Sequence, residues 1–121
     1  MNRRCLSLRR QRYYVLRGRR NALERIILGF RPMVAASLIP RRPRPGGPIA
    51  HYLSIHTPNN SRHLYVRKSE LERFRSRTEA YRKCIHAIAE WVQVNKAMER
   101  ELRAIRKLRC EKVDISRRKA R

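Results

Sequence analysis

The chain has 121 residues, a size typical of one domain, and carries 32 Lys and Arg residues against 9 Asp and Glu residues. Its formal net charge of +23 favours a polyanionic partner, either nucleic acid or an anionic membrane surface. No apolar run approaches the roughly 20 residues of a membrane-spanning helix, and Cys5, Cys84 and Cys110 form no C-x-x-C motif. Composition therefore argues against a membrane span, a zinc site and a disulfide framework, and it predicts a cytoplasmic protein without a cofactor.

The N-terminal part is predicted to be a disordered basic arm over residues 1–7, followed by a helix over residues 8–28. Apolar residues recur in the helix every three, four or seven positions, and Gly29 with Pro32 supplies the stop signal. The Arg-rich start lacks acidic residues and so also resembles a mitochondrial transit peptide. A basic tail that continues into the first helix is the simpler interpretation.

The next two segments are predicted from their prolines. Residues 33–39 are apolar and lie between Pro32 and Pro40, which indicates a strand, with a helical turn as the alternative. Residues 41–48 are rich in Pro and Gly, which excludes a helix or a central strand. They form an exposed loop that carries Arg41, Arg42 and Arg44.

A β-hairpin is predicted from residues 50–57 and 62–68, because the Pro-Asn-Asn-Ser segment between them has turn chemistry. If Thr57 pairs with Arg62, the strands have one apolar face and one polar face. The apolar face, expected to pack against the long helix, holds Leu53, Ile55, Leu64 and Val66. The polar face holds Tyr52, Ser54, His56, His63, Tyr65 and Arg67, with His56 directly opposite His63.

Residues 70–109 are predicted to form one helix of about 60 Å, since neither Pro nor Gly occurs after Pro58. Ser69 and Glu72 form an S-x-x-E capping box at its start. Its apolar positions alternate steps of three and four, which is the heptad pattern of a coiled coil. These seam positions are Leu71, Phe74, Thr78, Tyr81, Ile85, Ile88, Val92 and Asn95.

The fold class that follows is α+β, a long coiled-coil-like helical hairpin with a three-stranded antiparallel meander between the helices. It forms a single domain over residues 8–110, followed by a basic tail over residues 111–121. The first helix is expected to cover the seam only as far as Val92.

The rest of the seam is then left without a partner in the chain. After Asn95 the heptad pattern requires a step of four residues, but the next apolar residue is Met98, three residues on. This shortened step is a stammer in the heptad pattern. We expect a second copy or a partner helix to bind there. The predicted contact residues are Asn95, Met98, Leu102 and Ile105, and the alternative for Asn95 is that it faces water beyond the end of the seam.

Several short motifs occur in a familiar order. They are Tyr52-Leu53-Ser54, Arg62-His63-Leu64-Tyr65-Val66, Thr78-Glu79-Ala80-Tyr81-Arg82 and a late Asn95. Over residues 12–108 this order resembles an uncharacterised family of small prokaryotic domains of unknown function. Members usually carry a Cys-rich knuckle between the first two strands and are regarded as metal-binding or nucleic-acid-associated. Residues 41–48 take that place here without a cysteine, so the resemblance implies the fold and no metal site.

The predicted nucleic-acid-binding residues fall into two groups. Arg41, Arg42 and Arg44 are the loop residues expected to contact phosphates. Tyr52, His56, His63, Tyr65 and Arg67 form the sheet face expected to stack on bases and hold phosphates. The alternatives are an ordinary flexible loop and a solvated face whose tyrosines reflect β-propensity. The opposed His56 and His63 are a weak metal pair, because a third ligand is missing.

Catalysis is not expected. The acidic residues lie mostly on the long helix beside basic ones, and Ser54 near His56 has no acidic partner. The main hypothesis is therefore a DNA- or RNA-binding or nucleoprotein-accessory protein that contacts phosphates with little base readout. One alternative is a coiled-coil protein–protein interaction module whose basic surface is incidental, with arginine raised by a GC-rich genome. Another is a structural component of a large ribonucleoprotein.

Overall fold

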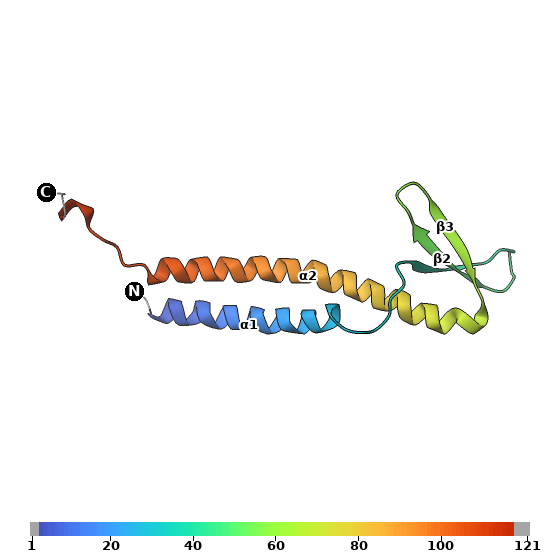
Figure 1. Cartoon of the computed structure of the whole chain (residues 1–121), viewed down its shortest axis with the longest axis horizontal. Helices are drawn as coiled ribbons and strands as arrows, with labels where there is room; N and C mark the ends of the chain where they lie inside the picture. The colour runs from blue at the N-terminus through green and yellow to red at the C-terminus, as the bar shows by residue number, and fades with distance from the viewer. Residues whose placement is uncertain (1–2, 118–121) are drawn as a thin grey trace. The chain divides into compact units, whose positions relative to one another are not determined.

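The computed structural model describes residues 3–117 and has an α+β layout (Figure 1). The chain begins with helix α1 (Arg3–Ile27) and continues through strands β1 (Ser37–Arg41), β2 (Ala50–His56) and β3 (Ser61–Val66). Helix α2 (Leu71–Arg109) follows the strands. Two short 3-10 helices span Lys68–Glu70 and Ile115–Arg117. The predicted fold class, with a strand meander between two helices, is confirmed.

Helix α1 begins earlier than the sequence suggested. The segment predicted to be a disordered arm is helical from Arg3, and residues 1–2 of that arm lie outside the described residues, as do residues 118–121 of the basic tail. This end of the helix is not free in solvent. Leu6 is partly buried, and Arg9 donates a hydrogen bond to Glu101 at 3.2 Å. The tail residues 111–116 are exposed.

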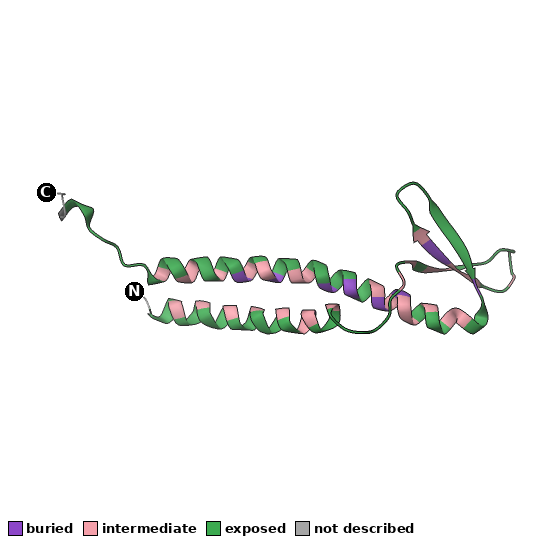
Figure 2. Cartoon of the chain, viewed as in Figure 1, coloured by how far each residue is buried: buried purple, intermediate pink, exposed green. Residues whose placement is uncertain are grey.

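The chain forms two compact units. In the first, residues 3–25 run antiparallel to the part of α2 that begins at residue 89 (Figure 1). The inward positions of α1 alternate steps of three and four, and those of α2 do the same (Figure 2). They are Leu6, Arg9, Tyr13, Leu16, Arg20 and Leu23 on α1, and Trp91, Val94, Met98, Glu101, Ile105 and Leu108 on α2. This is a heptad seam, as in a two-stranded coiled coil.

The predicted seam of α2 has the right period and includes the buried Thr78, but it is wrong at Ile85, Ile88 and Val92. Ile85, Ile88 and Val92 are 44%, 45% and 38% exposed. The buried residues lie one position earlier, about 100° around the helix. They are Ala80, Cys84, Ala87 and Val94, and Met98, where the predicted seam continues, is buried as well. Two apolar stripes with the same period therefore share α2, and the stripe with smaller side chains is the buried one.

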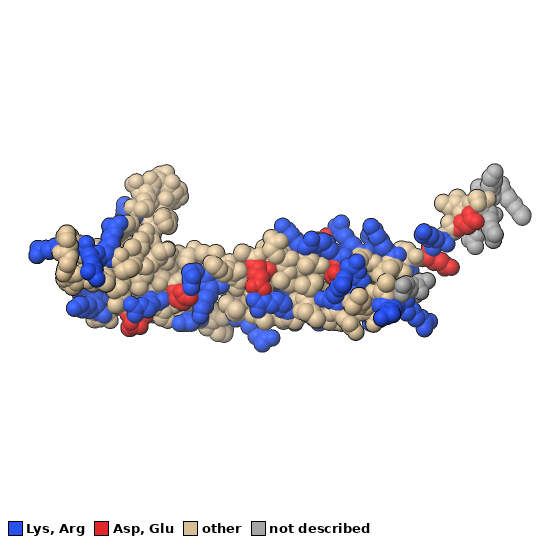
Figure 3. Space-filling model, turned by 180° about the vertical axis from the view of Figure 1, so that it is seen from behind, with Lys and Arg blue, Asp and Glu red and all other residues tan. Residues whose placement is uncertain are grey.

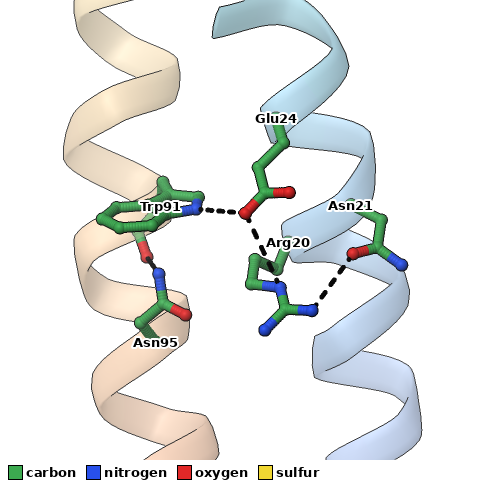
Figure 4. A network of polar contacts seen from close by, with 5 residues as sticks. All are labelled: Arg20, Asn21, Glu24, Trp91 and Asn95. Atoms are coloured by element: carbon green, nitrogen blue, oxygen red, sulfur yellow. Dashed lines mark hydrogen bonds and ion pairs between the residues drawn. The ribbon is translucent and has the colours of Figure 1, made fainter. Parts of the chain in front are cut away.

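Polar side chains fix the register of the helical hairpin (Figure 4). The indole Nε1 of Trp91 donates to a carboxylate oxygen of Glu24 at 3.1 Å, and the guanidinium of Arg20 lies 3.9 Å from that oxygen. Asn95 donates its side-chain N–H to the carbonyl oxygen of Trp91 at 3.0 Å. Sliding one helix along the other would break the Trp91–Glu24 hydrogen bond and leave the partly buried indole N–H unpaired, so this contact favours one alignment.

An exposed ion pair supports the same alignment. Arg19 donates two hydrogen bonds to Glu90, and these bonds lower the pKa of the Glu90 carboxyl below its ordinary value. Because both side chains are largely in solvent, the pair adds little to stability and acts mainly by orienting the helices.

The second unit, residues 26–88, contains the sheet. Its strands are antiparallel in the order β1-β2-β3, with Pro40 on the edge strand, where its missing N–H is tolerated. The first strand is displaced from its predicted position at residues 33–39. Before Ser37 the backbone instead meets α2, where the amide of Val34 donates to the carbonyl oxygen of Arg77 at 3.1 Å.

The hairpin register differs from the predicted one by two residues. Thr57 and Asn60 close the turn, with the Thr57 amide donating to the Asn60 carbonyl oxygen at 2.8 Å, so Ser61 begins β3 opposite His56. A slip of two residues keeps every side chain on its expected face but changes each partner. Tyr52 now lies opposite Tyr65, and Leu53 opposite Leu64.

Burial on the sheet depends on the strand as well as the face, because the central strand β2 is more buried than the edge strand β3. Leu53 and Val66 of the apolar face are 5% and 4% exposed, whereas Leu64 is 51% exposed. Ser54, which was predicted to face solvent, is only 4% exposed. The expectation that one whole face of the hairpin forms the core is therefore only partly correct.

Replacing Leu23 with Ala tests the packing of the helical hairpin. Leu23 is 2% exposed, so the change is expected to lower the free energy of unfolding by about 2–5 kcal/mol. Urea denaturation followed by circular dichroism measures it. The control Val15→Ala, at a position 74% exposed, is expected to change that free energy by less than about 0.5 kcal/mol. Equal effects of the two variants would contradict the seam.

Candidate nucleic-acid interface

The acidic residues are unevenly distributed along the chain. No acidic residue occurs between Glu24 and Glu70. The basic residues within this interval are Arg25, Arg31, Arg41, Arg42, Arg44, Arg62, Arg67 and Lys68. The strands and their loops therefore have no carboxylate of their own to neutralise them.

Elsewhere most carboxylates are already paired. Within residues 3–117, seven glutamates each form an ion pair with an arginine. They are Glu24, Glu70, Glu72, Glu79, Glu90, Glu99 and Glu101. Figure 3 shows acidic side chains interspersed among the basic ones along the helices. The positive charge of the helices is thus partly offset, and that of the sheet segment is not.

One groove collects the features expected of a nucleic-acid contact. It has a volume of about 320 Å³ and lies where the loop after β1, the start of β2, the end of β3 and the first residue of α2 meet. We call it the Tyr65 groove. Its polar lining residues are Arg44, His51, Tyr65 and Lys68, and its apolar ones include Ile49, Val66 and Leu71. None of its lining residues is acidic.

Tyr65 is held by a second tyrosine. The rings of Tyr52 and Tyr65 lie on directly opposed positions of β2 and β3, with centroids 5.8 Å apart and planes inclined at 69°. This edge-to-face contact restricts the Tyr65 side chain, which is still 61% exposed. A rigid, exposed aromatic ring beside cations is suited to stacking on a flat aromatic ligand.

The structure brings only some of the predicted site residues together. Arg44 and Tyr65 line the Tyr65 groove, and Tyr52 contacts Tyr65. Arg41 ends the edge strand β1, Arg42 follows it, and both are exposed. Arg67 is exposed between β3 and the 3-10 helix.

The two histidines of the predicted face are separated. His56 lies opposite Ser61, and His63 lies opposite Ser54, so the prediction that they oppose one another is wrong. The turn closed by Thr57 and Asn60 sets this register. Within residues 3–117 there is no group of three or more His, Cys, Asp or Glu side chains placed to hold a metal ion.

His56 instead lines a larger groove, of about 650 Å³, between the first two strands and α2. Two arginines also line it, but Arg75 bonds to Glu72 and Arg82 bonds to Glu79. The hydrogen bonds from Arg82 lower the pKa of the Glu79 carboxyl, which stays ionised at neutral pH. This His56 groove is therefore less positive than the Tyr65 groove and fits a polyanion less well.

Lys68 and His51 were missed by the sequence reasoning. The sequence predicts Lys68 as the last residue of a strand, whereas it begins the 3-10 helix that leads into α2. The available signal was the adjacent Arg67-Lys68 pair just before the helix start, which places two cations at the same end of the sheet.

The predicted oligomer contacts are also revised. The expectation that α2 beyond Asn95 lacks a partner in the chain is wrong, because α1 covers it. Met98 is 4% exposed, Asn95 bonds within its own helix, and Glu101 accepts from Arg9. Ile105 is partly buried and Leu102 is 49% exposed.

Comparisons with protein-family models, with curated proteins and with solved structures found no match. The resemblance to a small prokaryotic family therefore stays a prediction. Neither helix, over the residues described, is long and apolar enough to cross a membrane.

Proposed function

We propose that this protein binds nucleic acid, mainly through phosphate contacts made by its acid-free sheet segment. The observation that carries the proposal is the Tyr65 groove, where Arg44 and Lys68 flank an exposed aromatic ring and no carboxylate is present. A polyanion relieves the repulsion between these cations, and each phosphate that it contributes releases condensed counterions.

Two further features favour nucleic acid over an anionic membrane surface. Arginine greatly outnumbers lysine, and its planar fork matches phosphate oxygens in two places at once. An aromatic ring next to the cations also offers a stacking surface, which a nucleobase uses and a lipid headgroup does not. Binding of this kind depends on charge and stacking, so it reads little base sequence.

Salt dependence tests the phosphate contacts. Replacing Arg41, Arg42 and Arg44 with Gln is expected to reduce the slope of log K against log salt concentration by about 2 for a single strand. Fluorescence anisotropy with a labelled oligonucleotide between 50 and 300 mM KCl measures this slope.

The matched control replaces Arg12, Arg17 and Arg25, which are exposed on α1, with Gln. It removes the same charge from a different surface, so its slope should fall by less than half as much. Binding that does not respond to salt, or no binding to DNA or RNA at low salt, contradicts the proposal. An equal decrease of the slope in both triple variants contradicts the placement of the binding surface on the sheet segment.

A second candidate function is self-association through α2. The stripe of half-buried Tyr81 and exposed Ile85, Ile88 and Val92 keeps heptad spacing, and no Lys or Arg occurs between residues 84 and 95. Two copies running antiparallel would place Ile85 against Ile88 and Tyr81 against Val92 without opposing cations. The stripe thus fits a second copy of the chain better than an acidic partner.

Light scattering after size exclusion tests this second candidate. It predicts a dimer that Ile88→Asp converts to a monomer, because a carboxylate in the shared stripe would lose its water. Val15→Asp, on exposed α1, is the control and should leave the dimer intact. A wild-type monomer at 100 µM rules out self-association.

A further inference from the structure

We propose that the Tyr65 groove holds one unpaired nucleotide, with its base against Tyr65 and its phosphate between Arg44 and Lys68. This inference rests on the proposed function and adds the class of substrate, which is single-stranded rather than duplex nucleic acid. Four observations support it: the size of the groove, its apolar floor, its rim of unneutralised cations and the rigidity of the loop that carries Arg44.

The size of the groove fits a single nucleotide. Its volume of about 320 Å³ lies at the lower end of the range of about 300–1,000 Å³ typical of small-molecule sites. In a duplex each base is stacked on both faces, so its ring cannot reach Tyr65. In a single strand a base can be splayed out and stacked on a side chain.

The floor of the groove is apolar and the rim is cationic. Ile49 is 49% exposed and lines the groove together with the buried Val66, so a base that enters the groove covers apolar surface of Ile49. On the rim, Arg44 and Lys68 form no ion pair with any described residue. A nucleotide combines a flat, weakly polar ring with a charged phosphate, and this groove offers a matching surface for each part.

Carboxylates close by in the sequence do not offset the rim. Glu70 and Glu72 follow Lys68 within four residues, but each is engaged one turn further along the helix. Glu70 lies 3.9 Å from the guanidinium of Arg73, and Glu72 bonds to Arg75. Both carboxylates are thus paired with arginines of α2, and the cations of the groove remain available to phosphate.

The loop that carries Arg44 is preorganised by a tight turn. The amide of Gly47 donates to the carbonyl oxygen of Arg44 at 2.9 Å, and Gly46 has a φ of +76°. With Pro45 at the second position, these are the signatures of a type II turn, in which the third residue needs a positive φ. Because the turn fixes the backbone at Arg44, binding has less backbone entropy to remove there.

Oligonucleotide pairs of equal length test the inference. The probes are a fluorescein-labelled 12-nucleotide single strand, its duplex, and an abasic strand that keeps the phosphates but lacks the bases. The wild-type protein is expected to bind the intact single strand about tenfold more tightly than the abasic strand. Anisotropy titrations at 150 mM KCl give the three dissociation constants.

The key variant is Tyr65→Ala, which should weaken single-strand binding about tenfold and change duplex and abasic binding less than twofold. Tyr65→Phe keeps the stacking ring and should bind as the wild type does. The matched control is Tyr14→Ala, because Tyr14 is 55% exposed and forms its own edge-to-face pair with Tyr13 at 5.6 Å. It should leave all three affinities unchanged.

Outcomes separate this inference from the proposed function. If all three probes bind with the same salt-dependent affinity and Tyr65→Ala changes none of them, the groove assignment is overturned and phosphate binding stands. If no probe binds at 50 mM KCl, both fall. Circular dichroism melting checks that Tyr65→Ala folds. Arg44→Gln leaves the tyrosine pair intact and provides an independent variant, which should weaken single-strand binding several-fold.

Discussion

The placement of nine acidic residues among 32 basic ones is the constraint on which the structure and its proposed use depend. The glutamates of the helices are paired with arginines, and two of these pairs join the helices, Arg9 with Glu101 and Arg19 with Glu90. These pairs let two strongly basic helices lie side by side. From residue 25 to residue 69 no carboxylate is available, and the charge that remains there needs an external counterion.

Charge alone would make any polyanion a ligand, and the local geometry of the sheet unit narrows the choice. The hairpin register places Tyr65 opposite Tyr52. The Tyr65 side chain also lines a groove together with Arg44 and Lys68. The type II turn at Pro45 and Gly46 then holds Arg44 in place. In the proposed binding mode, selectivity for an unpaired base would come from the Tyr65 ring and affinity from the cations around it.

The spacing of apolar residues predicted the helices and the meander. It failed where two alternative arrangements, such as two apolar stripes on one helix, have the same spacing. On α2 the stripe of Ile85 and Ile88 and the stripe of Ala80, Cys84 and Ala87 both repeat every seven residues. Residue size favoured the first stripe as the seam, but packing selected the second. In the hairpin, alternation identified the faces, and only the hydrogen bonds of Thr57 and Asn60 fixed the register. Lys68 was missed because its role depends on a contact between segments distant in sequence.

Photo-crosslinking tests the central claim most directly. A single strand that carries one 5-iodouracil is irradiated with the full-length protein, and the crosslinked peptide is identified by mass spectrometry. The account predicts a crosslink at Tyr65, with loss of that peptide signal in Tyr65→Ala and its retention in Tyr14→Ala. Crosslinks confined to the tyrosines of α1, Tyr13 and Tyr14, would contradict it.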